Sequence, residues 1–211
     1  PALLAYRELS KELGIWILVG SLAIRREGGD RLANRSYLLN NLGEIVARYD
    51  KIHMFDVALA NGYSFKESEN YRPGAEAVLA NSPWGPIGLT ICYDLRFPYL
   101  YRCLAKAGAK ILTVPSAFTR KTGSAHWHVL LRSRAIETGS YILAPAQCGD
   151  HEDGRKSFGH SLIINPWGEV LADGGPEVGT VNATLDLDKV TEARTMIPAL
   201  DHERPIRKSF S

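Results

Sequence analysis

Apolar and polar positions along the chain follow two different periods, which predicts helices alternating with strands. Apolar side chains three or four positions apart are typical of amphipathic helices and mark residues 3–13, 99–107, 125–138 and 188–197. Short apolar or alternating runs are typical of strands and mark residues 15–24, 86–91, 110–114, 141–146 and 179–185. We expect residues 15–24 to form a buried strand, because this run is almost continuously apolar.

Two β-hairpins are predicted where turn residues separate short apolar runs. Asn40-Asn41-Leu42-Gly43 lies between residues 35–39 and 44–49, and Asn165-Pro166-Trp167-Gly168 lies between residues 161–164 and 169–172. Residues 55–73 are polar with scattered aromatic side chains, which indicates a long loop. Alternating helices and strands with two inserted hairpins predict an α/β fold with a mixed sheet.

Cys92 is the most informative residue, because it ends an apolar run and precedes a polar turn. Pro98 follows at a plausible first position of the next helix. A thiol at the carboxyl end of a strand lies beside helix N-terminal N–H groups, which favour a thiolate and can receive an oxyanion. Cys92 is therefore a candidate nucleophile of a covalent hydrolase. The alternative is an apolar cysteine that caps a core strand.

Two charged residues are further candidates. Lys51 follows the first hairpin and is either a solvated edge charge or an ammonium that stabilises developing negative charge in a cleft. Glu67 lies within residues 55–73 and is either solvated or a carboxylate that positions the ammonium and moves protons.

Histidine chemistry and metal binding are disfavoured. The chain has six histidines, and no pattern in the sequence brings one of them beside Cys92. A zinc set would need His126, His128, Cys148 and His151. Two histidines two positions apart on a helix point in diverging directions, so both cannot hold one ion. We expect no metal ion and no cofactor, since no glycine-rich phosphate-binding motif is found.

Composition limits the class of protein. The chain has 211 residues, 23% of them charged, and a net charge of +2, which fits one globular domain and does not suggest nucleic acid or a membrane surface as partner. Its longest apolar run, residues 15–24, is too short to span a bilayer. Three cysteines, an odd number, argue against a disulfide framework and indicate a cytoplasmic protein. Cys103, on a predicted helix, is expected to fill the core.

Several motifs together resemble the nitrilase superfamily, the carbon–nitrogen hydrolases. They run in order along nearly the whole chain: RYDKIH at 48–53, FKES at 65–68, GLTICYDLRF at 88–97, TGSAHW at 122–127, RSRAIE at 132–137, GHS at 159–161 and PWGEV at 166–170. The resemblance implies an α-β-β-α sandwich with mixed sheets, formed by residues 1–211 as a single domain.

The resemblance also assigns catalytic roles. It implies a Glu–Lys–Cys triad in which Cys92 is the nucleophile and Lys51 is the lysine. A second glutamate, matched by Glu67, helps to order the site. The Tyr93 backbone N–H and Lys51 are expected to stabilise the anionic intermediate.

The general-base glutamate of the family is the one departure. It normally lies on a strand upstream of the segment that contains Glu8 and Glu12, so its role is not transferred to either residue. We expect this chain to lack the N-terminal strand and helix of the fold, and the base with them. A catalytically incompetent binding subunit is therefore the alternative to an active enzyme.

The substrate class follows from the branch of the family. AQCGDH at 146–151 and GHS at 159–161 resemble deaminated-glutathione amidases, with omega-amidases as near neighbours. This implies hydrolysis of a small carboxylate-bearing amide through a thioester, with release of ammonia or an amine. An omega-amidase or a nitrilase acting on another small substrate remains an alternative. A homodimer or higher homo-oligomer is expected.

Substrate contacts are the least determined part of this interpretation. Arg96, Phe118 and His126 are candidate substrate-binding residues, and Arg120 and Lys121 are cationic candidates by position alone. His128 stands where many relatives carry a glutamate, so this chain departs from the branch there.

Overall fold

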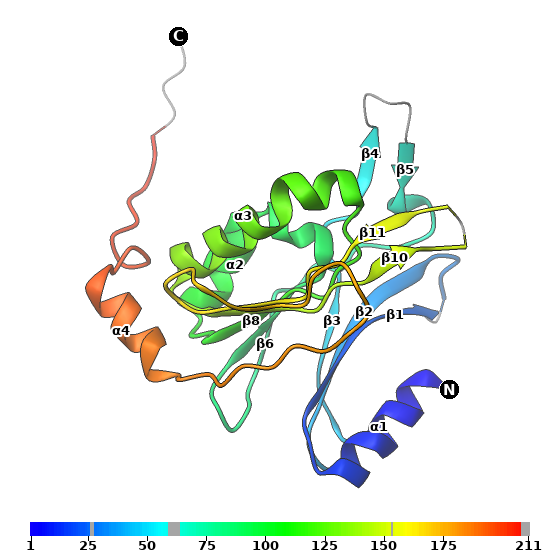
Figure 1. The fold of residues 1–211 in the computed structure, drawn as a ribbon, viewed down its shortest axis with the longest axis horizontal. Helices are drawn as coiled ribbons and strands as arrows, with labels where there is room; N and C mark the ends of the chain where they lie inside the picture. Colours follow the sequence, from blue (N-terminus) through cyan, green and yellow to red (C-terminus); the bar gives the residue numbers. More distant parts are fainter. Residues whose placement is uncertain (26–27, 59–63, 153, 208–211) are drawn as a thin grey trace.

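Two β-sheets face each other in the computed structural model, which describes residues 1–25, 28–58, 64–152 and 154–207 (Figure 1). One sheet is antiparallel and consists of β1 (Ile17–Arg25), β2 (Leu32–Leu39) and β3 (Ile45–Asp50). The other has the order β13-β12-β9-β8-β7-β6. Its strands are β6 (Val78–Ala80), β7 (Ile87–Leu89), β8 (Ile111–Thr113), β9 (Tyr141–Ala144), β12 (Leu162–Ile164) and β13 (Val170–Asp173). Within it, β7, β8 and β9 are parallel and the outer pairs are antiparallel, so the sheet is mixed as predicted.

Helices cover the outer faces of both sheets. α2 (Pro98–Lys106) and α3 (Arg120–Thr138) lie on one side of the molecule, and α1 (Ala2–Leu13) lies on the opposite side (Figure 1). α4 (Asp188–Met196) lies near the C-terminal end of the chain, beyond the six-stranded sheet (Figure 1). The layers are therefore helix, sheet, sheet, helix, which confirms the α-β-β-α sandwich.

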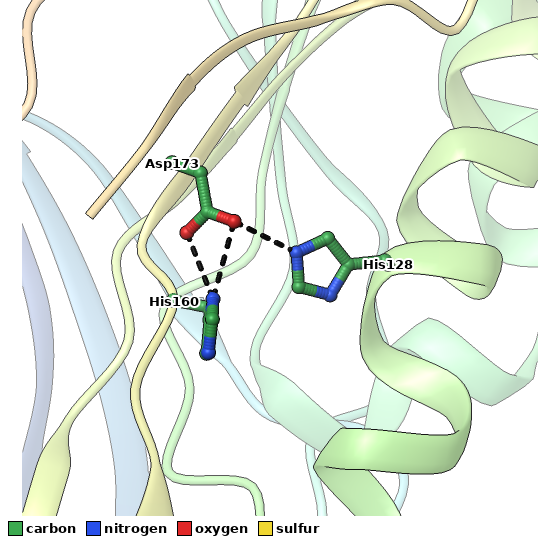
Figure 2. A group of neighbouring side chains, drawn as sticks. All are labelled: His128, His160 and Asp173. Atoms are coloured by element: carbon green, nitrogen blue, oxygen red, sulfur yellow. Dashed lines mark hydrogen bonds and ion pairs between the residues drawn. The ribbon is translucent and has the colours of Figure 1, made fainter. Parts of the chain in front are cut away.

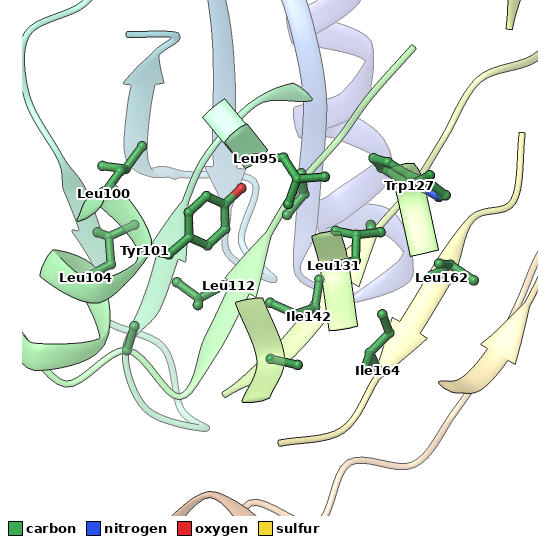
Figure 3. Close-up of a cluster of buried hydrophobic side chains, with 14 of the residues drawn as sticks. Leu95, Leu100, Tyr101, Leu104, Leu112, Trp127, Leu131, Ile142, Leu162 and Ile164 are labelled. Carbon is green, nitrogen blue, oxygen red and sulfur yellow. The ribbon is translucent and has the colours of Figure 1, made fainter. Parts of the chain in front are cut away.

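Alternation of side chains along the strands explains why each sheet buries two faces. In β8, Leu112 belongs to the cluster beneath α2 and α3, whereas its neighbour Ile111 faces the other sheet. In β2, Leu38 joins the cluster between the sheets, whereas Leu39 faces the α1 side. Figure 3 shows the cluster beneath α2 and α3, in which Trp127 is a fully buried side chain.

Both predicted hairpins are confirmed, and the same pattern of hydrogen bonds to an asparagine side chain forms each turn. The Asn40 side-chain oxygen accepts the backbone N–H groups of Leu42 and Glu44 at 3.0 and 2.9 Å. Asn165 repeats this pattern with the two corresponding N–H groups, each at 3.0 Å. Gly43, with φ of 73°, supplies the left-handed residue that the first of these turns needs.

Three expectations about elements are wrong. β1 is not a buried strand, because it forms an edge of its sheet and Val19 is its only buried residue. Residues 55–73 are not simply a loop, since they contain β4 (Asp56–Ala58), paired with β5 (Ser64–Lys66), and the 3₁₀ helix η1 (Glu67–Glu69); residues 59–63 of this segment lie outside the described residues. Cys103 is exposed, because the buried face of α2 consists of Leu100, Tyr101, Leu104 and Ala105.

Residues 179–185, predicted as a strand, form no strand in the described part of the chain. Side chains from Val181 to Leu187 alternate between half-buried and exposed, so the expected period is present. Leu185 and Leu187 pack against the cluster between the sheets. The segment is therefore extended over the core without joining a sheet. An alternation with a period of two is the same for a paired strand and for an unpaired extended segment, so the sequence could not distinguish them.

Five short strands and the true start of α3 were not predicted. β4, β5, β6, β10 (Cys148–Asp150) and β11 (Lys156–Phe158) are each three residues long. β6 is an edge of the six-stranded sheet, and the other four make two small antiparallel pairs. α3 begins at Arg120 rather than at residue 125, because the Thr119 side chain caps it by accepting the Thr122 N–H. Among the helices of the described residues, none has the length and apolar character needed to cross a membrane.

Candidate active site

Cys92 lies at a sharp bend between β7 and the 3₁₀ helix η2 (Cys92–Arg96). Its φ is 51°, in the left-handed region that residues other than glycine rarely adopt. The Cys92 N–H donates to the Pro115 carbonyl at 3.0 Å, which ties the bend to the segment after β8. Such backbone strain concentrates at functional sites. The half-buried thiol is therefore fixed at the carboxyl end of a strand, where the sequence placed it.

Lys51 and Glu67 form a buried ion pair, so neither is the solvated surface charge that was the simpler alternative. Their side chains are 3% and 7% exposed, and the Lys51 Nζ lies 2.5 Å from Glu67 Oε2. Glu67 also accepts the Phe55 N–H at 2.7 Å and the Asn34 amide at 3.1 Å. Both oxygens of the carboxylate are thus engaged, and the ammonium is held in one position.

Asp94, which the sequence analysis did not select, joins the bend to the end of β3. It is fully buried, and one carboxylate oxygen accepts Tyr49 Oη at 2.7 Å and the Ile91 N–H at 2.9 Å. The other accepts the backbone N–H of His53 at 3.1 Å and contacts the imidazole of His53 at 2.7 Å. Burial, followed by the charge of Asp94, raises the pKa of Tyr49 far above its ordinary value, so Tyr49 stays a neutral donor. This network fixes Cys92 relative to Lys51.

One cavity of about 450 Å³ brings the candidate residues together. Its lining includes Cys92, Lys51, Glu67 and Tyr93. This volume is in the range of small-molecule sites. A thiol, an ammonium and a carboxylate that lie far apart in the sequence therefore face a common space.

The cationic and aromatic candidates are divided between this cavity and the surface. Arg96 and Phe118 line the cavity, and the Arg96 guanidinium lies over the rings of Tyr93 and Phe118, at 5.7 and 5.5 Å. His126 is exposed and does not line the cavity, but its Nδ1 lies 3.4 Å from both terminal nitrogens of Arg96. It can therefore act on the cavity only through Arg96.

Other candidates lie elsewhere. Arg120 pairs with Asp150 on the surface at 2.9 Å, and Lys121 is exposed; neither lines the cavity. Glu8 and Glu12 are exposed on α1 and do not line it either. His128 contacts Asp173 rather than the cavity.

Several polar lining residues were missed from the sequence. Asn34, Gln147 and Arg155 line the cavity together with three threonine and serine side chains that carry no motif of their own. Two of them had a readable signal, since Asn34 directly precedes the predicted hairpin that leads to Lys51 and Gln147 lies in the motif at 146–151. The β10–β11 segment, which supplies Arg155, was not predicted as a pair of strands.

A family model described as carbon-nitrogen hydrolase matches residues 1–195. The chain is 42% identical over 200 residues to the deaminated glutathione amidase of Yersinia enterocolitica, covering 94% of this chain and 70% of that protein. It is 43% identical over 204 residues to the deaminated glutathione amidase of Homo sapiens, covering 95% of this chain and 62% of that protein. The chain thus spans less than two thirds of the human relative.

Solved structures agree with this similarity. The C. elegans NitFhit protein aligns with a TM-score of 0.90 and 39% identity, over 96% of this chain and 50% of that one. An amidase variant from Nesterenkonia sp. AN1, with the acetamide moiety of fluoroacetamide added covalently at its active site cysteine, aligns with a TM-score of 0.73 and 28% identity, over 84% of this chain and 64% of that one. By the family match, the identity to curated relatives and the shared fold, the chain belongs to the carbon–nitrogen hydrolase family.

Proposed function

We propose that this chain carries the nucleophile and the anion-stabilising groups of an amidase that acts on a small carboxylate-bearing amide. The observation that carries the proposal is the convergence of Cys92, Lys51 and Glu67 on one cavity. The deaminated glutathione amidases among its relatives support the same reaction class.

The proposed chemistry is acyl transfer through a thioester. The Cys92 sulfur passes its proton to a general base, which later returns it to the leaving nitrogen, and attacks the amide carbon, forming an S–C bond and an anionic oxygen. Lys51, held by Glu67, and the Tyr93 N–H stabilise that oxygen. The C–N bond then breaks as the nitrogen takes up a proton and leaves as ammonia or an amine. Water hydrolyses the thioester, which releases the acid and restores the thiol.

The charge of the cavity supports a carboxylate on the substrate. Among the described residues that line it, Lys51, Arg96 and Arg155 are cationic and Glu67 is the only carboxylate. Lys51 is engaged by Glu67, whereas Arg96 lines the cavity with its guanidinium over two aromatic rings. We assign Arg96 and Phe118 to substrate binding, with His126 positioning Arg96. A deaminated-glutathione-like amide fits this charge, and an omega-amidase or nitrilase substrate is the alternative.

A binding subunit without turnover is the second candidate function, and one observation favours it. The thiol needs a proton acceptor, yet the only lining carboxylate among the described residues, Glu67, already accepts three hydrogen bonds. Glu67 therefore acts as a positioning group, and the described residues that line the cavity offer no second carboxylate to take the thiol proton. Because triad members act as a unit, a site without such a base would turn over several orders of magnitude more slowly.

Substrate hydrolysis tests the proposal on residues 1–211 and on a longer chain extended to the length of the curated relatives. The substrates are deaminated glutathione, whose amide nitrogen leaves as a dipeptide amine, and alpha-ketoglutaramate and a simple nitrile, which release ammonia. We expect the longer chain to hydrolyse deaminated glutathione fastest, and Cys92→Ala to abolish product release. Cys103→Ala is the matched control, since it removes an exposed thiol from α2. Undiminished release by Cys92→Ala would overturn the nucleophile assignment.

The two candidate functions give different results in calorimetry. If both chains bind deaminated glutathione and neither releases its dipeptide amine, the binding subunit is correct and the amidase is wrong.

We further propose that the protein is cytoplasmic and forms a homodimer or a higher homo-oligomer. Three free cysteines fit a reducing compartment. Light scattering coupled to gel filtration tests the oligomer, and a monomeric mass would contradict it.

A further inference from the structure

Two histidines and an aspartate meet on the face of the molecule formed by α3 and the β12–β13 hairpin. His128 Nε2 lies 3.0 Å from one oxygen of Asp173, and His160 Nδ1 lies 2.9 and 3.1 Å from the two oxygens (Figure 2). The three ligand atoms all lie within 4.8 Å of one another. Neither histidine nor Asp173 lines the cavity that holds Cys92, so the proposed amidase chemistry does not use this group.

His160 is held by its surroundings. Its φ is 57°, so it adopts a strained left-handed conformation like that of Cys92. Its N–H donates to the Gly175 carbonyl at 2.6 Å, and its own carbonyl accepts Trp127 Nε1 at 2.8 Å. The imidazole stacks on Phe158, with ring centroids 4.4 Å apart. The ring therefore keeps its direction toward Asp173.

The other two members of the group are also fixed. His128 projects from the third turn of α3, and its ring meets that of His160 at 5.1 Å and 71°. Asp173 ends β13, and its Oδ1 also accepts the Gly175 N–H at 2.9 Å. Three different segments thus direct one donor atom each to the same point.

The donor set fits a divalent transition-metal ion. Two imidazole nitrogens and a carboxylate oxygen are ligands that suit Zn²⁺, and bond lengths of about 2.0–2.1 Å place tetrahedral ligands about 3.4 Å apart. The observed contacts of 2.9–3.1 Å need only a slight expansion to admit an ion. The neutral imidazoles can bind the ion without losing a proton. In each ring the proton can move to the nitrogen that faces away from Asp173, which leaves the other nitrogen free to be the ligand.

We propose that His128, His160 and Asp173 form a binding site for a divalent transition-metal ion, with Zn²⁺ as the probe. The side chains are between 23% and 35% exposed, which leaves a path for the ion and room for water as a fourth ligand. The ion clamps α3 to the β12–β13 hairpin. Ser161, the neighbour of His160, lines the catalytic cavity, so the clamp steadies one of its walls.

The sequence analysis combined His128 with the wrong partners. His126, Cys148 and His151 are not in the group, whereas Asp173, which is, lies 45 residues after His128 in the chain. Only the packing of α3 against the hairpin creates the ligand set.

Zinc titration of the EDTA-treated chain tests the proposal. Calorimetry is expected to give one Zn²⁺ per chain, and saturating Zn²⁺ to raise the Tm by about 5 °C. His128→Gln keeps an N–H donor for Asp173 but removes the imidazole ligand, so we expect at least tenfold weaker binding and no rise in Tm. We expect Asp173→Asn to weaken Zn²⁺ binding and to abolish the rise in Tm in the same way. His202→Ala, which removes an exposed histidine near the C-terminal end, is the matched control and should bind Zn²⁺ like the parent chain.

Cobalt identifies the ligands independently. Co²⁺ bound by nitrogen and oxygen gives visible bands without the near-ultraviolet charge-transfer band of a thiolate ligand. A thiolate band, or loss of binding in Cys92→Ala, would place the ion on a cysteine and overturn the site. Equal affinity in His128→Gln and the parent chain would also overturn it. Absence of Zn²⁺ binding at millimolar concentration would show that Asp173 only bridges two imidazoles.

Discussion

Lys51 and Glu67 are buried as an ion pair, so the stability of each charge depends on the other. Removing both charges from water is unfavourable, and the short contact between them offsets that penalty only while both are present. Loss of one partner leaves the other charge buried and unpaired. A loss of activity in a Lys51 variant therefore needs a stability measurement beside it.

A double-mutant cycle separates the two effects. We expect Lys51→Met to lower the free energy of unfolding by about 3–5 kcal/mol, because the Glu67 carboxylate then lacks its counter-charge. Lys51→Met combined with Glu67→Gln should recover much of that loss without recovering ammonia release. Urea unfolding measures the stability of each variant. Strictly additive losses would contradict the coupling.

Asp94 gives a second prediction at this scale. Asp94→Asn replaces a carboxylate that accepts from Tyr49, Ile91 and His53 with an amide that cannot satisfy all of them. We expect a loss of about 1–3 kcal/mol in the free energy of unfolding and a slower reaction of Cys92 with iodoacetamide. Asp30→Asn, at an exposed turn, is the matched control. If both variants unfold at the same urea concentration, Asp94 does not secure the bend.

The site could be predicted from the sequence only in part. That Cys92, Lys51 and Glu67 would lie together was expected, because each lies in a short motif that resembles the family, and one cavity does bring them together. Asp94 lies in the same motif as Cys92, but its contact with Tyr49, 45 residues earlier in the chain, cannot be read from either motif.

Among the elements, α3 depends on close contact with β11. Gly123 lies on the buried face of α3, and a Cβ added there would lie 2.3–2.7 Å from atoms of the Phe158 ring and its Cβ. No side chain fits in that space without displacing Phe158, which itself stacks on His160. The helix can therefore approach the small sheet only at a glycine.

Gly123→Ala tests this approach. We expect the free energy of unfolding to fall by about 1–3 kcal/mol, because the overpacked contact forces α3 away from β11. Ser124→Ala, one residue further on the exposed face, is the control and should stay close to the parent chain. Thermal unfolding measures both. A Tm for Gly123→Ala equal to that of Ser124→Ala would show that the contact is easily relaxed.

Elements were predictable in proportion to their length and local signals. The asparagine-containing turns identified both hairpins, and Gly14 and Pro98 marked the end of α1 and the start of α2. Strands of three residues, such as β6 and β10, are too short to display a period. The burial of β1 was predicted wrongly, because its composition does not say that it forms the edge of a sheet.

At the scale of the whole molecule, the helix layer and the edge of the six-stranded sheet are joined through Asp173. Burial alone would raise its pKa, but hydrogen bonds from His128, the Gly175 N–H and His160 outweigh burial and hold the pKa below its ordinary value. A carboxyl whose pKa is lowered on folding stabilises the folded state at pH values above its unfolded pKa, about 3.9. That contribution disappears as the pH falls through the folded-state pKa.

The lowered pKa of Asp173 predicts how the stability difference between the parent chain and Asp173→Asn changes with pH. We expect the parent chain to be more stable at pH 7, by less than about 1 kcal/mol because the side chain is partly exposed, and the difference to shrink as the pH falls below the unfolded-state pKa of about 3.9. Urea unfolding of metal-free protein across this pH range measures it. A difference that grows as the pH falls would contradict the assigned direction.

The left-handed backbone of Cys92 implies a conflict between foldability and chemistry at one position. In that region a Cβ is penalised by about 1–2 kcal/mol, so glycine is the residue that the fold alone would select. Cys92→Gly should therefore be more stable than Cys92→Ala, the reverse of the usual order of these two residues. If so, natural selection has kept a conformationally disfavoured side chain for the sake of its sulfur.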